Sequence, residues 1–251
     1  MPAWVILALV AAAGVAVVLI SALALRAAGG DLRTGRRLAG PPEVRVGTLL
    51  DGSGPTGRTL RVSGRIRCRD PLLVGGGERL VAFHRDVEVR LPRVGWRSVE
   101  RLREARSFEL WDHDGSLTID PSLAAEPLLT IPSVWRGAPS ELEEPHASAA
   151  RMLAERHDEA AVEARATTRT INVTDRLLVL ARVADRADGG LGLEPPEGGY
   201  LITNLALDEA MRLLGGRHRR LTAAAVAGLG AGTILAVAGL AGAIVAAAVR
   251  A

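Results

Sequence analysis

Two stretches of the sequence hold residue types that could do chemistry, and the first is WDHDG at 111–115. Asp112 and Asp114 flank His113 there. Carboxylates beside a histidine could bind a metal ion or take part in acid–base catalysis. The Asp-Gly dipeptide, however, is typical of the turn that closes a β-hairpin. We therefore favour a solvated hairpin tip over a metal or acid–base site.

The second stretch is GLGAGT at 228–233, whose glycines could form a phosphate-binding loop. A dinucleotide fingerprint has the spacing G-x-G-x-x-G after a strand, with an acidic residue about 20 positions later. Here the spacing is G-x-G-x-G, an alanine-rich segment precedes it, and no acidic residue follows. A Walker loop needs a lysine, and all 31 basic residues are arginine. The glycines do not predict a nucleotide site.

The other chemically capable side chains form no recognised set. H-E-x-x-H, G-x-S-x-G and C-x-x-C are all absent from the sequence. We expect surface or capping roles for the five scattered histidines, and a small core residue at Cys68. Neither a metal nor another cofactor is expected. The histidines are His84, His113, His146, His157 and His218.

Two uncharged segments predict membrane-spanning helices. Residues 3–25 contain 23 uncharged residues, and residues 221–249 contain 29. About 20 apolar residues cross the hydrocarbon core of a bilayer. No basic residue precedes the first segment, which is also long for a signal peptide, so we expect an uncleaved anchor. The bilayer is the first expected partner.

Small residues recur every four positions in the second segment. Such spacing predicts that Gly228 and Gly232 allow another helix to approach closely. An alanine-rich sequence can also produce it by chance. The two spans are expected to pack as a pair, and a homo-oligomer through the same helices is a further possibility. The series are Ala224, Gly228, Gly232 and Ala236, and, in the first segment, Ala8, Ala12 and Ala16.

Arginines lie on the inner side of both spans, which predicts the topology. The positive-inside rule places residues 40–216 in the cytoplasm, with a bacterial inner membrane as the expected location. A net charge of +3 without a concentrated basic face does not predict a nucleic-acid partner. The flanking arginines are Arg26, Arg33, Arg36 and Arg37, and then Arg212, Arg217, Arg219 and Arg220.

The middle of the chain, residues 40–216, predicts a β-rich α+β domain flanked by two transmembrane α-helices. Alternating apolar residues predict strands at 60–68 and 80–91, with Val87, Val89 and Leu91 facing inward. A glycine turn at 75–77, a hairpin at 107–120 and strands at 168–173, 177–183 and 200–202 follow from similar patterns. Helices are expected at 147–166 and 205–214, the latter between an Asn204 N-cap and the Gly215–Gly216 pair.

One face of the first strand carries Arg61, Arg65 and Arg67. These arginines could contact an acidic partner or anionic lipid headgroups. Cross-strand ion pairs with acids such as Asp86 and Glu88 are the alternative that we favour.

Three stretches occur in a characteristic order: a tryptophan-bearing strand leading to Phe-acid-Leu and a glycine hairpin at 89–120, a strand pair at 174–196, and LEPPEGGYLIT at 193–203 before the second apolar segment. This ordered set resembles the GIDE-type, or "beside a membrane", domain of mitochondrial membrane-anchored RING ubiquitin ligases. The resemblance implies a domain that lies between two membrane spans. It also implies that seven residues of this chain occupy positions of the family motif. These positions are Pro195, Pro196, Gly199, Tyr200, Trp96, Phe108 and Gly115. From the residues alone, the Pro-Pro-Glu-Gly-Gly segment is either a structural turn or a ligand-facing loop.

The chain departs from that family in one respect. A RING finger needs eight Cys or His zinc ligands in paired spacings, whereas this sequence has one cysteine and five histidines. We therefore expect no intrinsic ubiquitin transfer and a non-enzymatic interaction or sensor domain with an unknown protein partner. The alternative is a membrane subunit of a separately encoded effector, such as a ligase-like or protease complex.

Overall fold

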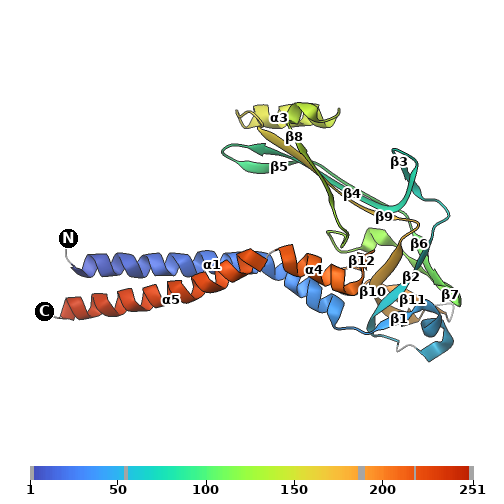
Figure 1. The fold of residues 1–251 in the computed structure, drawn as a ribbon, viewed down its shortest axis with the longest axis horizontal. Coiled ribbons are helices and arrows are strands. Elements are labelled where there is room, and N and C mark those ends of the chain that lie inside the picture. Colours follow the sequence, from blue (N-terminus) through green and yellow to red (C-terminus); the bar gives the residue numbers. More distant parts are fainter. Residues whose placement is uncertain (1–2, 54–55, 186–189, 218, 249–251) are drawn as a thin grey trace. The chain divides into compact units, whose positions relative to one another are not determined.

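The structure is a computed structural model that describes residues 3–53, 56–185, 190–217 and 219–248. The chain divides into two compact units (Figure 1). One unit combines Met1–Ala39 with Met211–Ala251, and the other is Gly40–Ala210. The predicted α+β class with two apolar helices is confirmed.

Two helices of the first unit are long and apolar enough to cross a membrane. They are α1 (Ala3–Ala39) and α5 (Arg219–Ala248). At 1.5 Å per residue, their 37 and 30 residues correspond to roughly 55 Å and 45 Å of helix. Helix α1 continues to Ala39, well past the predicted segment 3–25, although Gly29, Gly30 and Gly35 lie in the added part.

Glycines let α1 and α5 lie against each other, side by side in Figure 1. A β-carbon added at Gly232 would stand 2.9 Å from the Gly14 carbonyl oxygen. One added at Gly239 would stand 2.6 Å from the backbone nitrogen of Ala11. Carbon atoms do not approach backbone atoms so closely, so the helix–helix distance requires glycine.

The contacting face differs in part from the series of small residues expected from the sequence. Gly228 meets the Ser21 side chain of α1, and Ala236 packs near Gly14. Ala224 is exposed, however, and its neighbour Ala225 is buried instead. A strict four-residue spacing drifts around a helix of 3.6 residues per turn, so no four-residue series stays on one face. Ala8, Ala12 and Ala16 are all exposed on α1, because the contact face of that helix carries Ala11, Gly14 and Ser21 instead.

The domain of the second unit is built on two sheets. Sheet A has the order β11-β10-β2-β6-β7, with β1 parallel to β2 and β12 antiparallel to β10. Its strands are β1 (Glu43–Arg45), β2 (Thr59–Arg67), β6 (Phe108–Asp112), β7 (Gly115–Ile119), β10 (Arg176–Asp185), β11 (Leu191–Glu194) and β12 (Leu201–Thr203).

Sheet B has the order β3-β4-β9-β8, with β5 on the other side of β4. Its strands are β3 (Leu72–Val74), β4 (Glu78–Leu91), β5 (Gly95–Ala105), β8 (Ser133–Gly137) and β9 (Glu163–Asn172). The main core lies between the sheets and joins side chains such as Val62 and Val179 of sheet A to Val81 and Ile171 of sheet B. Val87, Val89 and Leu91 are buried as predicted.

Helix α3 (His146–Arg156) covers one face of sheet B (Figure 1). Leu142 and Ala150 pack there against Val87, Val89 and Ala164. The prediction of one helix over 147–166 is wrong in its second half. The chain turns at Asp158, whose φ is +51°, and β9 begins at Glu163. Pairing with β4 overrides the helix propensity of the alanines and glutamates after 160.

The short elements of the chain complete the fold. α2 (Val46–Thr48) and a π-helical turn (Leu49–Ser53) precede β2, and 3-10 turns occupy Pro121–Leu123 and Pro139–Glu141. Helix α4 spans Leu207–Arg217 and therefore starts later than predicted. Asn204 is not its N-cap, because α4 begins three residues later, and the Asn204 amide donates a hydrogen bond to the Asp175 carboxylate. The predicted stop at Gly215–Gly216 is also wrong, since both glycines are helical.

Candidate functional site

The family-like segment around Tyr200 is a structural turn in the domain. Gly199 has a φ of +89°, and its N–H donates to the Pro196 carbonyl 2.9 Å away. Tyr200 is 2% exposed, and its hydroxyl donates to the Leu193 carbonyl over 2.7 Å. Pro195 and Pro196 lead into this turn. The segment thus joins β11 to β12, which pair one after the other with β10.

The same turn is hydrogen-bonded to residues 123–125, which follow β7 in the chain. The Tyr200 N–H donates to the Leu123 carbonyl at 3.0 Å, and the Ala125 N–H donates to the Tyr200 carbonyl at 2.7 Å. A β-carbon at Gly199 would stand 2.7 Å from the Leu123 oxygen. Only glycine therefore satisfies both the positive φ and the close approach.

The three other family positions also have packing roles, and they lie on separate strands. Phe108 of β6 is buried in the main core. Trp96 of β5 lies under the Arg165 guanidinium, 4.2 Å from ring centroid to Cζ. Gly115 begins β7 where a β-carbon would overlap the Leu50 side chain. The fold does not bring these three residues together with Tyr200 into one pocket.

The tip of the WDHDG hairpin is held by a contact with a distant segment of the chain. The two turn residues of the hairpin are His113 and Asp114, one position earlier than expected. The Asp112 carboxylate accepts hydrogen bonds from the N–H of Gly47 at 2.8 Å and of Asp114 at 3.0 Å. Partial burial opposes ionisation, but these N–H groups and that of Gly115 prevail and lower the pKa of Asp112. Among the described residues, no cluster of three or more His, Cys, Asp or Glu side chains could hold a metal ion.

The expected arginine face is divided by the fold. Arg61 is only 9% exposed, because it lies on a stretch of β2 in which every residue from Leu60 to Gly64 is buried. Arg65 and Arg67 are exposed. Arg67 reaches Glu109 at 3.8 Å and stacks over Trp111 at 4.7 Å. The prediction of one surface formed by all three arginines is therefore wrong.

Asp86 and Glu88 pair within sheet B and not with those arginines. The Arg103 Nη2 lies 2.7 Å from Asp86 Oδ1, and the Arg165 Nε lies 2.7 Å from Glu88 Oε2. Arg169 approaches Asp86 at 3.9 Å from the opposite strand. Asp86 and Glu88 are wrong as the expected partners because β2 and β4 belong to different sheets. The expected cross-strand pairing itself is found for Arg67, which lies opposite Glu109 of β6. Cys68, expected in the core, is half-buried at its edge.

His84 belongs to this group of charges and is almost sealed from solvent. It is 6% exposed and stands opposite Arg103 and Arg169 in the strand register. Burial, with Arg103 next in importance, lowers the pKa of His84 to about 4. The ring is therefore neutral at physiological pH. Such a perturbed histidine is a feature of many active sites, but a substrate must also reach it.

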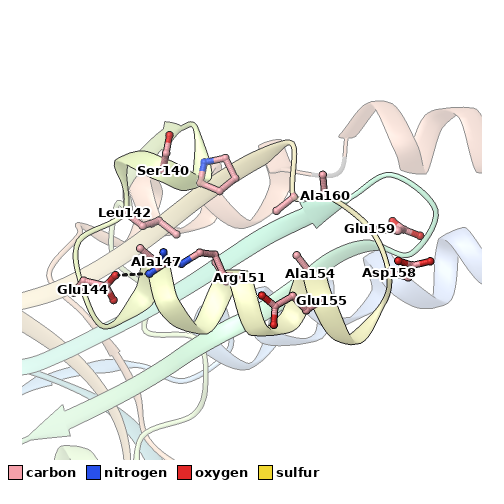
Figure 2. Close-up of a pocket in the computed structure, with 13 residues that line it drawn as sticks. Ser140, Leu142, Glu144, Ala147, Arg151, Ala154, Glu155, Asp158, Glu159 and Ala160 are labelled. Carbon is pink, nitrogen blue, oxygen red and sulfur yellow. Dashed lines mark hydrogen bonds and ion pairs between the residues drawn. The ribbon is translucent and has the colours of Figure 1, made fainter.

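The accessible candidate site is a groove of about 890 Å³ between α3, the turn before it and the chain that leaves it. We call this the α3 groove (Figure 2). Its volume is within the range of small-molecule and peptide sites. The lining residues are Pro139, Ser140, Leu142, Glu144, Ala147, Ala150, Arg151, Ala154, Glu155, Asp158, Glu159, Ala160 and Ala161.

The α3 groove combines a small apolar floor with a charged rim. Five alanines leave the space open, since each side chain ends at Cβ. At one end Glu144 pairs with Arg151 at 2.9 Å. Figure 2 shows Asp158 and Glu159 at the other end, with Glu155 before them on the last turn of α3. Of the three carboxylates, that of Glu159 accepts the Arg93 N–H at 3.0 Å.

Sequence reasoning missed the α3 groove because it treated residues 147–166 as one helix. A signal was present, however. Ala147, Ala150 and Ala154 have the i, i+3, i+7 spacing of one helix face. A helix face of alanines covers a sheet without filling the space beside it. The comparisons offer no further guide to function, since no family model, curated protein or solved structure matches this chain.

Proposed function

We propose that this chain is a two-span integral membrane protein whose β-rich domain binds a partner and does not itself catalyse a reaction. The observation that carries the proposal is the paired arrangement of α1 and α5. Gly14 on one helix and Gly232 on the other meet at backbone contact. This close approach of small residues is the way that membrane helices associate when no hydrophobic driving force exists between them.

The outward surface of the pair supports placement in lipid. Large aliphatic side chains on both helices are exposed although water would disfavour such a surface. A bilayer would cover them. They include Ile6, Leu9, Leu19, Ile20 and Leu23 of α1, and Ile234, Val237, Leu240, Ile244 and Val245 of α5.

For orientation we propose a bacterial inner membrane with the β-rich domain in the cytoplasm. The support is the arginine bias next to the spans. Arg26, Arg33, Arg36 and Arg37 lie on α1 beyond residue 25, and Arg212 lies on α4 before α5. The positive-inside rule counts basic residues of this kind within about 15–20 residues of a span.

A binding role is supported by what the chemically capable side chains do. Asp112 accepts backbone hydrogen bonds and Tyr200 donates to a backbone carbonyl, so both are used in packing. The ordered motifs around Tyr200 make a GIDE-type domain our proposal for the family. Ubiquitin transfer by this chain is not proposed, because its sequence lacks the cysteine pairs of a RING finger.

The second candidate function is a membrane subunit of a separately encoded effector. It is favoured by the α3 groove, an open site on the domain that another protein could occupy. A homo-oligomer through the membrane helices would need a face other than the one that carries Gly228 and Gly232. Those glycines already contact α1 of the same chain.

The test uses intact bacterial cells that express the full chain with Cys68→Ala and a single new cysteine, Asp70→Cys. The Asp70 side chain is 93% exposed, so a cysteine there is accessible to a maleimide. We expect the protein to stay in membranes after alkaline carbonate extraction. We also expect labelling by a membrane-impermeant maleimide only after lysis.

Carbonate extraction tests membrane integration, and maleimide labelling tests the orientation of the domain. Release by carbonate would contradict membrane integration. Labelling in intact cells would leave integration standing and reverse the orientation, so the search for partners would move to the cell envelope. The Cys68→Ala chain without a new cysteine is the control for background labelling.

A further inference from the structure

We propose that the α3 groove binds an extended peptide segment that combines small apolar side chains with arginine or lysine. This inference rests on the proposed binding function and names the class of partner. It depends on three properties of the groove: its length, its floor and the distribution of charge along it.

The length suits a short stretch of extended chain. Helix α3 has 11 residues and is therefore roughly 16 Å long. An extended peptide advances about 3.3 Å per residue, so about five residues would lie alongside the helix.

The floor selects apolar side chains of small to moderate size. Leu142 and Ala150 are buried, and Ala147, Ala154 and Ala161 are half-buried around them. Placing apolar atoms on this floor would remove both surfaces from water. The gain is about 25 cal/mol for each Å² of apolar area that is covered.

The charge along the groove selects a cation at one end. Glu144 and Arg151 neutralise each other at the N-terminal end of α3. At the C-terminal end, Glu155, Asp158 and Glu159 line the groove, and Arg151 is the single basic residue in the whole lining. Helix α3 also directs its negative dipole end toward these three acids, which adds to their attraction for a cation. An acidic peptide would meet repulsion at the same place.

The experiment measures peptide binding to the full chain in nanodiscs of phosphatidylcholine, a zwitterionic lipid that does not attract basic peptides electrostatically. The probe is acetyl-Ala-Arg-Val-Ala-Arg-amide with a neutral fluorophore, followed by fluorescence anisotropy. The matched probe replaces both arginines with glutamate. Empty nanodiscs give the background for each peptide.

Two sets of variants test the acids. The groove set is Glu155→Gln, Asp158→Asn and Glu159→Gln, where asparagine tolerates the positive φ of Asp158. The control set removes the same charge from exposed acids outside the groove lining: Glu78→Gln, Glu141→Gln and Glu143→Gln. The floor is tested by Ala154→Phe, with Met152→Phe on the exposed side of α3 as its control.

We expect saturable binding of the arginine probe that weakens about tenfold in the groove set and little in the control set. Binding should also weaken between 50 and 500 mM salt, and Ala154→Phe should abolish it. Equal binding of the glutamate probe, equal loss in both charge sets, unchanged binding in Ala154→Phe, or no saturable binding would each overturn the inference.

The result separates this inference from the proposed function. Protein that enters nanodiscs but does not bind the arginine probe would overturn the role of the groove and leave membrane anchoring intact. Protein that fails to enter nanodiscs would count against anchoring, and the same titration in free solution would still report on the groove.

Discussion

The backbone N–H of Gly47 donates a hydrogen bond to the Asp112 carboxylate, 2.8 Å away and 65 residues later in the chain. This contact attaches the short turns after β1 to the tip of the β6–β7 hairpin. The approach is so close that a side chain at Gly47 would collide with Asp114. An Asp-His-Asp sequence that could suggest catalysis is thereby used to join two distant segments.

Removing the charge of Asp112 should destabilise the domain. Asp112→Asn keeps the shape but weakens the hydrogen bonds from three backbone N–H groups, and we expect a loss of about 1–2 kcal/mol. The measurement is urea unfolding of the full chain in detergent, followed by tryptophan fluorescence. Asp70→Asn, at an exposed carboxylate, is the matched control. An equal, small effect in both variants would show that Asp112 does not stabilise the hairpin.

Substitution of Gly199 should separate backbone strain from steric overlap. Gly77 has a φ of +82° and open space around it, so Gly77→Ala should cost roughly 1 kcal/mol from conformation alone. Gly199→Ala adds overlap with the backbone of Leu123 and Ala125, and we expect about 3 kcal/mol or more. Unfolding free energies of the two variants test this. Equal losses would mean that the contact with the 123–125 segment is easily relaxed.

Acidification should destabilise the domain through His84. Its pKa is about 4 in the folded state and 6.5 in the unfolded chain, so between these values the unfolded chain binds a proton that the folded state does not. Stability is therefore highest above pH 6.5 and falls as the pH approaches 4, by up to about 3 kcal/mol.

Unfolding measured from pH 7 to pH 4 checks the role of His84. The slope should flatten in His84→Gln and persist in His113→Gln, because His113 is an exposed turn residue. The acids that face His84, Asp86 and Glu126, remain in both variants, as do Arg103 and Arg169. An unchanged slope in His84→Gln would assign the pH dependence to other groups.

The glycine contact between α1 and α5 should be sensitive to substitution of Gly232 and insensitive to substitution of Gly230. Gly232→Ile would place a branched side chain against Gly14 and Val18 of α1, whereas Gly230 has open space where a β-carbon would point. A disulfide between Leu7→Cys and Gly242→Cys, in a Cys68→Ser chain, reports helix pairing, because these positions face each other. We expect Gly232→Ile to lower the cross-linking yield several-fold and Gly230→Ile to leave it unchanged. Equal yields would contradict the packing.

Some parts of the fold follow from local patterns. The alternation around Val87, Val89 and Leu91 predicted the buried face of β4, and the run of uncharged residues predicted both long helices. The glycines at 75–77 predicted a turn. Each of these features depends on hydropathy, on side-chain period or on the backbone freedom of glycine, which are properties of neighbouring residues.

Other parts depended on which strands become neighbours. Arg61 has the same alternation as Arg65 and Arg67, yet it is buried, because the fold covers both faces of β2 from Leu60 to Gly64 and only one face beyond. Asp86 found one partner, Arg103, on the next strand β5, and another, Arg169, on β9, far away in the sequence. Residues 163–166 have a helix-forming composition. They nevertheless form the start of β9, because their backbone pairs with β4. Local propensity is weaker than a complete set of strand hydrogen bonds.

The sequence by itself determined the α+β class, the two apolar helices, most strand positions and the glycine-rich character of α5. Only the tertiary structure decided that Asp112 is a packing residue, that His84 is sealed among arginines, and that an alanine-floored groove with acids at one end lies along α3. The reason is physical. Segment type depends on interactions within about one turn or two strand residues, whereas burial, ion pairs and cavities depend on contacts between residues that the chain order does not bring together.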